Sequence, residues 1–518
     1  MLVAVALSAT LASSPASCES LKSLTLPNTT IVAAEMVPAG PFVAPGRGAA
    51  PAPPAPPAEG RGRAGGGGGQ FIQAPQIAPA HCRVNAILRP SSDSEIEMEA
   101  WLPENWNGKF QFVGGGGWAG IISFPAMVAA LQEGYATAST DTGHKGGNAL
   151  FAINHPEKVV DFAYRAVHET TVQAKALIAK YYDRPARLSY WNGCSTGGRQ
   201  GLMEAQKFPD DFDAIIAGAP ANYQTHLHTW DLSVAVPVLN NPAAALTQPK
   251  LRALNEAAIE ACDAQDGAKD GIINNPRACK FDPSVLLCKG SDGPNCLTQP
   301  QLDAVKRAYA PAKTKSGDVV FPGKEPGSES QWMSFLGGGT APGVSVGSFL
   351  VAYNDGNWDA KTFDLDRDLK LVDEKVGTVI NAVNPDLSAF KAHGGKLLLY
   401  HGWIDTAISP GNTINYYESV LKSMGGKSSG RQLDDFVRLY MAPGMQHCGG
   451  GPGPNQINYM AIMERWREGN QTPASIEAIR VTNNRVDMTR PLCPYPQVAR
   501  YSGQGSIDDA ANFRCVAP

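Results

Sequence analysis

Trp191-Asn192-Gly193-Cys194-Ser195-Thr196-Gly197-Gly198 lies between a run of β-strand character at 187–191 and a helical pattern at 199–208. A serine flanked by glycines at such a strand-to-helix turn is typical of a nucleophile held in a strained backbone conformation. The glycines allow the helix and the strand to approach each other closely. The helix N-terminus then presents amide N–H groups to a developing oxyanion. We therefore predict that Ser195 is a nucleophile and not part of a structural turn.

A second Gly-x-Ser-x-Gly match shows that the motif alone is a weak signal. Gly343-Val344-Ser345-Val346-Gly347 follows a glycine-rich segment, 337–343, and no strand pattern precedes it. The strand–turn–helix context that a nucleophile of this kind requires is therefore missing. We predict a loop at this position and assign the nucleophile to Ser195.

Strand and helix patterns alternate on both sides of Ser195. Short β-type runs are expected at 29–33, 95–102, 110–113, 135–141, 187–191, 214–217, 396–402 and 436–441, and order is expected to resume near 80–84 after the glycine-rich segment at 38–69. The run at 95–102 alternates like a half-exposed strand, and amphipathic helices are expected at 161–182 and 459–467. This alternation predicts an α/β fold with a mainly parallel sheet, and together with the serine turn it predicts the α/β-hydrolase fold.

The alternation of strand and helix patterns is lost between residues 221 and 385, where we expect loops and short helices. This region contains four cysteines and three of the nine tryptophans. We interpret this region as a lid domain inserted into the fold. The core then divides into a first part, 18–220, and a second part, 386–518. Residues 1–17 form a short apolar run that ends in small residues, as in a signal peptide. Residues 38–69 are rich in Pro, Ala, Gly and Arg and predict a mobile loop.

The composition excludes several classes of partner. The chain has 518 residues, a net charge of −4 and a pI near 6.2, so it lacks the basic footprint of a nucleic-acid-binding protein. No apolar run reaches the roughly 18 residues that a membrane-spanning helix requires. We expect neither a nucleic-acid nor a membrane partner, and the sequence leaves the oligomeric state unknown.

Two later strand patterns are followed by an acid and a histidine. In this fold the nucleophile precedes an Asp or Glu, which precedes a His, and both lie on loops after strands. Asp405 follows the run at 396–402, and His447 follows the run at 436–441. We predict that His447 takes the proton of Ser195, and that Asp405 orients His447 and stabilises its charged form.

Three other residues compete for these roles. His401 ends its strand and is interpreted as a packed or supporting histidine, whereas His144 is a candidate to line the pocket. Asp141 is a rival acid, but it precedes Ser195 in the chain, which is the wrong order for this fold.

The chain has ten cysteines, and an even number of cysteines in an exported chain indicates disulfides. The alternative, buried free thiols, would suit a cytosolic enzyme. The cysteines favour export. We therefore expect a secreted or periplasmic protein. A Cys18–Cys82 bond would join the two ends of the predicted mobile loop. Proximity along the chain suggests three further pairs, Cys262–Cys279, Cys288–Cys296 and Cys493–Cys515.

The two remaining cysteines adjoin the proposed catalytic residues. Cys194 precedes Ser195, and Cys448 follows His447. If the serine and the histidine meet at hydrogen-bond distance, the two sulfurs come within reach of a disulfide. Such a bond would hold nucleophile and base together across a long loop.

These motifs resemble one known family. Gly-Cys-Ser-x-Gly-Gly at 193–198, an Asp after Tyr-His-Gly-Trp at 400–403, and His-Cys-Gly-Gly-Gly-Pro-Gly at 447–453 are similar to the signature of the tannase and feruloyl esterase family of α/β-hydrolases. The likeness extends from about Cys18 to Cys515. It implies an exported serine esterase that cuts esters of aromatic acids, with a large lid and a Cys194–Cys448 disulfide.

The oxyanion hole of such an enzyme requires two amide donors. One is expected from Thr196, the residue after the nucleophile. The other is expected from the glycine loop at 114–117, where the backbone can approach a substrate closely. The similarity to the family implies Gly117 for this donor, with Gly116 as the alternative.

The lid segment 262–272 concentrates three carboxylates among glycines. It lacks the spacing and the terminal Glu of an EF-hand, but its hard oxygens suit Ca²⁺. The resemblance implies a structural calcium ion bound by the side chains of Asp263, Asp266 and Asp270 and by the carbonyl groups of Ala268 and Ile272. The alternative is a solvated acidic turn.

We predict a secreted serine esterase that hydrolyses esters of hydroxycinnamic, feruloyl-type acids through an acyl-enzyme. The resemblance leaves two alternatives, a tannase that cleaves gallate esters and, less favoured, a mono(hydroxyethyl) terephthalate hydrolase. The lid arginine that the latter uses has no clear counterpart at 345–349. Two proteins of other classes are a serine peptidase and a non-catalytic binding protein of the same fold. The presence of all three triad residues argues against the non-catalytic binding protein. Aromatic candidates to pack on the substrate, or to form the lid core, are Trp230, Trp332, Phe335 and Trp358.

Overall fold

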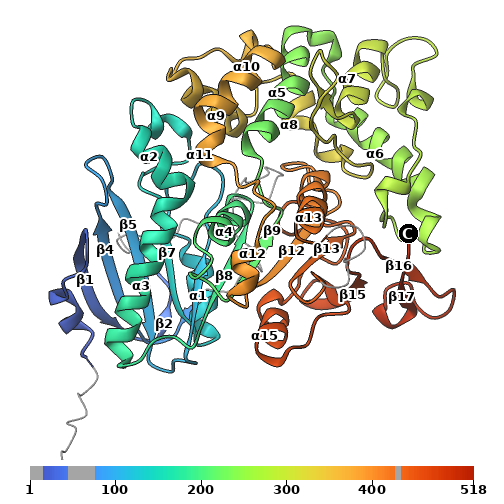
Figure 1. Cartoon of the computed structure of the whole chain (residues 1–518). Coiled ribbons are helices and arrows are strands. Elements are labelled where there is room, and N and C mark those ends of the chain that lie inside the picture. Colours follow the sequence, from blue (N-terminus) through green and yellow to red (C-terminus); the bar gives the residue numbers. More distant parts are fainter. Residues whose placement is uncertain (1–15, 45–75, 426–432) are drawn as a thin grey trace, which may run out of the picture.

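The computed structural model describes residues 16–44, 76–425 and 433–518. Its centre is a nine-stranded sheet in the order β1-β4-β5-β7-β6-β8-β9-β12-β13 (Figure 1). The strands are β1 (Thr29–Val37), β4 (His81–Leu88), β5 (Ile96–Pro103), β7 (Ala136–Thr140), β6 (Lys109–Val113), β8 (Leu188–Cys194), β9 (Ala214–Gly218), β12 (Lys396–Gly402) and β13 (Val437–Ala442). Most of the predicted signal peptide, 1–17, and of the predicted mobile loop, 38–69, lies outside the described residues.

The sheet is mixed, with its larger part parallel. Strands β7, β6, β8, β9, β12 and β13 form the parallel part, and β1, β4 and β5 extend it by antiparallel pairing. The predicted α/β fold with a mainly parallel sheet is confirmed. Because parallel strands present their carboxyl ends at one edge, the loops after β6, β8, β12 and β13 meet there.

Helices cover both faces of the sheet (Figure 1). Those on one face are α3 (Ala166–Tyr182), α4 (Thr196–Lys207), α12 (Ser388–Ala392) and α13 (Pro410–Gly425); those on the other are α1 (Phe124–Gln132) and α15 (Tyr459–Gly469). The predicted helix at 161–182 is α3, preceded by α2 (Pro156–Val160) and a π-helical turn, Asp161–Arg165. Within β12, Leu397 and Leu399 pack in one core and Leu398 and Tyr400 in the other. Coverage of both faces explains why these strands are continuously apolar.

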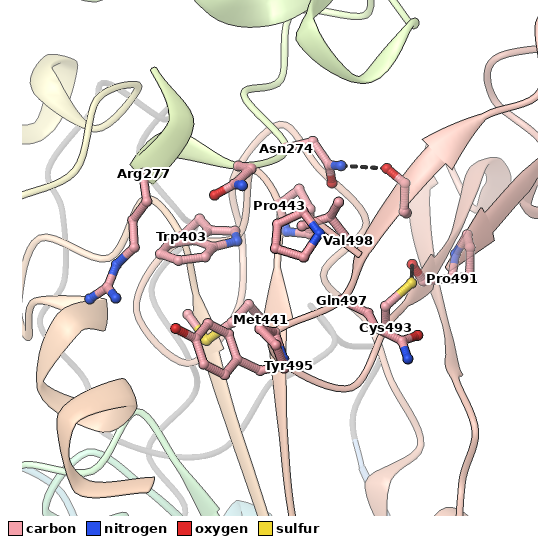
Figure 2. A pocket seen from close by; sticks show the side chains of 14 residues that line it. Asn274, Arg277, Trp403, Met441, Pro443, Pro491, Cys493, Tyr495, Gln497 and Val498 are labelled. Atoms are coloured by element: carbon pink, nitrogen blue, oxygen red, sulfur yellow. Dashed lines mark hydrogen bonds between the residues drawn. The ribbon is translucent and has the colours of Figure 1, made fainter. Parts of the chain in front are cut away.

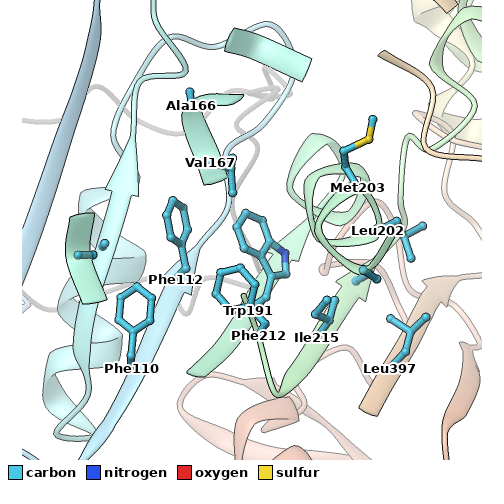
Figure 3. Close-up of a cluster of buried hydrophobic side chains, with 14 of the residues drawn as sticks. Phe110, Phe112, Ala166, Val167, Trp191, Leu202, Met203, Phe212, Ile215 and Leu397 are labelled. Carbon is cyan, nitrogen blue, oxygen red and sulfur yellow. The ribbon is translucent and has the colours of Figure 1, made fainter. Parts of the chain in front are cut away.

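Aromatic rings fix the strand that ends at Ser195. Trp191 stacks on Phe112 with 5.0 Å between ring centroids, and Phe212 meets the edge of the same indole at 5.6 Å. Figure 3 shows these rings to the left of Met203 and Leu202 of α4. Burial of each large apolar side chain contributes about 1.5–3 kcal/mol. The packing therefore holds β8 and α4 in a defined relation on either side of the turn.

The lid region, 221–385, forms a helical layer beside the sheet, at the top of Figure 1. Its helices are α5 (Gln224–Asn240), α6 (Gln248–Cys262), α7 (Gln299–Tyr309), α8 (Met333–Leu336), α9 (Gly343–Tyr353), α10 (Leu365–Val372) and α11 (Thr378–Ile380). The expectation of short helices was wrong for α5 and α6, which have 17 and 15 residues. Packing of their apolar faces in a separate lid core stabilises them.

The aromatic candidates of the lid belong to its cores. Trp230, Trp332 and Phe335 are buried in the first lid core, and Trp358 packs at the side of the second. Trp230 and Trp332 have no exposed surface, so these two rings stabilise the lid and do not reach a substrate.

The second Gly-x-Ser-x-Gly match lies in helix α9, so the predicted loop was wrong. Packing overrides the low helix propensity of its glycines. A Cβ atom on Gly347 would lie 2.6 Å from Trp118 Nε1, and the missing side chain lets α9 approach this ring. Ser345 is buried and donates a hydrogen bond to Asp231 at 2.6 Å, which gives this serine a structural role.

Strand β5 is buried on both faces, so the half-exposed prediction was also wrong. The polar positions of this strand include Glu99, whose charge is balanced by a partner inside the protein. Arg83 Nε donates to Glu99 Oε2 at 3.0 Å, and Trp101 Nε1 donates to the same oxygen at 2.9 Å. Pairing of this kind permits a charged residue at a buried position.

All ten cysteines form disulfides in the predicted pairs, Cys18–Cys82, Cys194–Cys448, Cys262–Cys279, Cys288–Cys296 and Cys493–Cys515. Two small hairpins complete the C-terminal part, β14 (Ile476–Thr482) with β15 (Arg485–Leu492), and β16 (Val498–Tyr501) with β17 (Phe513–Val516). Two further short pairs are β2 (Gly40–Pro41) with β3 (Ile77–Ala78), and β10 (Ala312–Lys313) with β11 (Val319–Phe321). None of the helices in the described ranges has the length and apolar character to cross a bilayer.

Helix α4 carries one buried acid, Glu204, at the end remote from Ser195. Its side chain is 1% exposed. Burial, and then the nearby Asp211 carboxylate, raise the pKa of Glu204 well above its usual range. The folded protein therefore keeps a proton that the unfolded chain releases near pH 4.3.

Replacement of Glu204 by Gln is expected to stabilise the protein increasingly as the pH rises. The pKa of Glu204 is higher in the folded protein than in the unfolded chain. The unfolding free energy of the wild type therefore decreases as the pH rises from the unfolded pKa to the folded pKa, by up to about 1.4 kcal/mol per pH unit. Gln lacks this penalty, so the difference in unfolding free energy grows across the window. Urea unfolding from about pH 5 to pH 8 measures it, with the exposed Glu256→Gln variant as the control. A pH-independent difference for Glu204→Gln would contradict the assignment.

Candidate active site

Ser195 occupies a strained turn between β8 and α4. Its φ of 65° and ψ of −123° lie in a region that non-glycine residues rarely adopt. Its amide donates to the carbonyl of Gly218 at 2.9 Å, which anchors the turn to β9. A Cβ atom on Gly193 would lie 2.7 Å from the carbonyl carbon of Gly197, so the two glycines of the motif are required by their close approach.

Asp405 follows β12 and is fully buried. Its Oδ1 accepts hydrogen bonds from the amides of Ala407 and Ile408, at 2.8 and 2.9 Å. Its Oδ2 accepts from His447 Nδ1 at 2.7 Å and from His401 Nε2 at 2.9 Å. Burial raises the pKa of Asp405, but the two histidines outweigh it and lower the pKa below its usual range. The carboxylate is therefore anionic at neutral pH.

His447 follows β13, and its side chain is 26% exposed. Because Nδ1 donates to a carboxylate, Nε2 is left as the basic nitrogen. The Cys194–Cys448 disulfide holds the neighbours of Ser195 and His447 together, with 5.9 Å between Cα atoms that are 254 residues apart in sequence. No hydrogen bond joins the Ser195 hydroxyl to His447 in the part of the chain described, and in free enzymes such bonds commonly form only with substrate.

The oxyanion candidates lie where the loop after β6 meets the start of α4. Thr196 Oγ1 donates to the carbonyl of Gly117 at 2.9 Å, and Gly197 N–H donates to the carbonyl of Gly115 at 2.9 Å. The amides of Thr196 and Gly117 donate no backbone hydrogen bond to any described residue. Both are thus free to donate to a substrate oxygen, as the two predicted oxyanion donors must be.

The competing residues have other partners. His144 Nε2 contacts the carbonyl of Trp118 at 2.8 Å and its ring stacks on Phe151, while burial lowers its pKa. Asp141 accepts hydrogen bonds from the amides of Glu97 and Gly143, and pairs with Lys145. Neither residue contacts the Ser195–Asp405–His447 set.

Two supporting residues lie beside the predicted site, Gln200, which was not predicted from the sequence, and His401, whose expected packed or supporting position is confirmed. Gln200 Oε1 accepts from the amide of Gly115 at 3.1 Å and so holds the oxyanion loop. Its place one helical turn after Thr196 is the signal that could have identified it. His401 lies between Asp405 and the hydroxyl of Thr413, which is 2.7 Å from its Nδ1, so it supports the acid directly.

The lid acids predicted to bind calcium lie on one loop. Asp263 accepts from the amides of Asp270, Gly271 and Ile272, and Asp270 also accepts from Arg490 at 2.6 Å. Burial raises the pKa of Asp266 to about 6, and the neighbouring Asp270 carboxylate adds to this shift. Carboxylate oxygens of this kind suit a hard divalent cation. In the described structure the side-chain oxygens of the three aspartates do not all lie within 4.8 Å of one another. Binding of one ion by all three therefore requires these side chains to move closer together.

A serine in a strained strand-to-helix turn, with an aspartate and a histidine after successive parallel strands, is the arrangement of a serine hydrolase with the α/β-hydrolase fold. The family model for tannase and feruloyl esterase matches residues 82–516. The chain belongs to this family, whose members are carboxylic ester hydrolases.

Individual relatives cover nearly the whole chain. An uncharacterized esterase of Xanthomonas campestris pv. campestris is 37% identical over 567 residues, which cover 99% of this chain and 94% of that protein. A probable feruloyl esterase B-1 of Aspergillus oryzae is 35% identical, covering 84% of each. The crystal structure of feruloyl esterase B from Aspergillus oryzae is 31% identical with a TM-score of 0.85, covering 96% of this chain and 99% of that one. Tannin acyl hydrolase from Aspergillus niger shares the fold, with 24% identity, a TM-score of 0.75, and coverage of 96% and 93%.

Replacement of His401 by Leu is expected to lower kcat/KM by about tenfold or more, because a hydrogen bond to a charged group contributes about 1.5–3 kcal/mol. Without this donor Asp405 binds the His447 proton more tightly, so the acidic limb of the kcat/KM profile moves to higher pH. His401→Gln retains a donor and should restore much of the activity. The surface variant His393→Gln is the control, and an unshifted profile for His401→Leu would exclude the positioning role.

Proposed function

We propose that this protein is an exported serine esterase that hydrolyses esters of aromatic, hydroxycinnamic-type acids through an acyl-enzyme. The observation that carries the proposal is the Cys194–Cys448 disulfide, which joins the residues next to Ser195 and His447, together with the hydrogen bond from His447 to Asp405. The amides of Thr196 and Gly117 donate no backbone hydrogen bond to the described residues and support the proposal further. Support for the substrate class comes from relatives at 31–35% identity that are named feruloyl esterases.

The proposed mechanism follows from the directions of the hydrogen bonds. His447 Nε2 takes the Ser195 proton as the hydroxyl attacks the ester carbonyl, and Asp405 stabilises the imidazolium that forms. The amides of Thr196 and Gly117 stabilise the oxyanion. His447 then protonates the leaving alcohol, and the same base activates a water molecule that releases the acid.

The proposal includes export and a structural calcium ion. Five disulfides favour an oxidising compartment, and the apolar residues at the start of the sequence have the character of a signal peptide. Asp263, Asp266 and Asp270, with the carbonyl groups of Ala268 and Ile272, would hold the calcium ion. The ion would neutralise the buried carboxylates and stabilise the lid loop that the Cys262–Cys279 disulfide closes.

Replacement of Ser195 by Ala is expected to reduce kcat for methyl ferulate by about four orders of magnitude or more, because the nucleophile is lost. Ser345→Ala is the matched control, since it removes the serine of the other Gly-x-Ser-x-Gly match, and it should retain hydrolysis. Wild-type rates on methyl ferulate, methyl gallate, mono(hydroxyethyl) terephthalate and a fluorogenic peptide then identify the substrate. Activity that survives Ser195→Ala would refute the nucleophile assignment, and preference for the peptide would refute the esterase.

Removal of calcium is expected to lower the melting temperature, because an ion bound only by the folded state stabilises it by about 2.7 kcal/mol at a hundred times its Kd. Elemental analysis of the purified protein should find one calcium per chain. Asp266→Asn should weaken this binding, whereas the exposed lid variant Asp303→Asn should not. A metal-free protein whose melting temperature is insensitive to chelator and to added calcium would exclude the site.

A further inference from the structure

A small cavity lies behind the loops that carry the proposed acid and base. It has a volume of about 160 Å³ and lies between the ends of β12 and β13, the lid segment 274–277 and the C-terminal segment 491–499. Figure 2 shows Trp403 and Met441 at its centre, with Arg277 on one side and Val498 on the other. None of the proposed catalytic residues lines it, so it is distinct from the active site.

The size and the walls of the cavity fit one aromatic ring. An apolar cavity of about 150 Å³ is large enough to hold benzene. Trp403 and Met441 are 3% and 7% exposed, and the Tyr495 ring and the Pro443 side chain complete an apolar wall. Indole and phenol faces, with a thioether between them, are the surfaces on which aromatic ligands pack.

A single cationic side chain lies at the edge of the cavity. Among the described residues, Arg277 is the only Lys or Arg that lines it. In the described structure its ion pair is with Glu325, through Nε at 3.5 Å, which is longer than a normal hydrogen bond. The guanidinium also interacts with the Tyr495 side chain, so it lies beside one of the rings of the cavity, and a guanidinium can bind a carboxylate in bidentate geometry.

We propose that this cavity is a second binding site for a single-ring aromatic carboxylate, with the ring between Trp403, Met441 and Tyr495 and the carboxylate on Arg277. The choice of an acid rests in part on the proposed function, because hydrolysis of an aromatic ester releases such an acid.

The site is coupled in structure to the catalytic loops. Trp403 N–H donates to the carbonyl of Ala442 at 2.9 Å, and Ile404 N–H donates to the carbonyl of Met445 at 3.1 Å. These bonds join the segment before Asp405 to the segment before His447. A ligand on Trp403 therefore packs against the backbone that positions both residues.

Calorimetry with benzoate tests the site in solution. The protein is first sulfonylated at Ser195 with phenylmethanesulfonyl fluoride, which fills the active site. Benzoate should then bind with one site per chain, whereas acetate, which lacks the ring, should not. Arg277→Gln should weaken benzoate binding by about tenfold or more and leave benzyl alcohol unaffected, because only the charge-assisted contact is lost.

Val498→Phe tests the cavity itself, because the added ring occupies the space of the ligand and should abolish binding. Matched controls are Val486→Phe and Arg500→Gln, which change exposed residues of the same C-terminal hairpins and should bind benzoate normally. Crystals soaked in 4-bromobenzoate should give an anomalous bromine peak between Trp403 and Val498.

Unchanged benzoate affinity in both Arg277→Gln and Val498→Phe, or a bromine peak at Ser195 alone, would overturn the second site. Ester hydrolysis that still depends on Ser195 would show that the proposed function stands in that case. Failure of the sulfonyl fluoride to modify Ser195 would instead count against the proposed function, and the bromine peak would then decide the second site alone.

Discussion

The buried negative charge of Asp405 is the constraint on which the catalytic edge of the sheet depends. A carboxylate without exposed surface is tolerated only when its oxygens are hydrogen-bonded and its charge is balanced. Four N–H donors from three elements meet this requirement, two amides of its own loop and one imidazole each from β12 and the loop after β13. The position of His447 therefore follows from the requirements of the acid as much as from those of the nucleophile.

The disulfide beside the triad solves a different problem. Ser195 and His447 are 252 residues apart in sequence, and the whole lid is inserted between them. Without a covalent link, packing alone would have to limit the freedom of the two residues relative to each other. The Cys194–Cys448 bond removes that freedom at the two positions next to the reacting groups. The strained φ of Ser195 is maintained in the same way, by contacts of its neighbours and not by its own side chain.

Local sequence patterns predicted the elements of the core because each strand there is short, apolar and bounded by a turn. The same reasoning failed where tertiary contacts decide the conformation. Gly347 lies in a helix because Trp118 packs where its side chain would be, and Glu99 is buried because Arg83 pairs with it. The placement of Asp405 and His447 after β12 and β13 was predictable from chain order, since the fold delivers strand ends to one edge, and their catalytic roles stay predictions. Gln200 and the contact of His401 with Asp405 were not predictable, because their roles depend on side-chain directions that periodicity does not contain.

The lid contributes charge as well as cover to the catalytic edge. Lys324 is 2% exposed and lies 4.4 Å from the centre of the Trp230 ring. Burial lowers its pKa, while the charges of Asp231 and Asp405 act in the opposite direction. Burial raises the pKa of Asp231 to about 6, and the charge of Asp405 adds to this shift. Because these groups respond to Asp405, the lid and the triad share one electrostatic environment. The electric field of Asp405 therefore extends into the lid core, to Lys324 and Asp231.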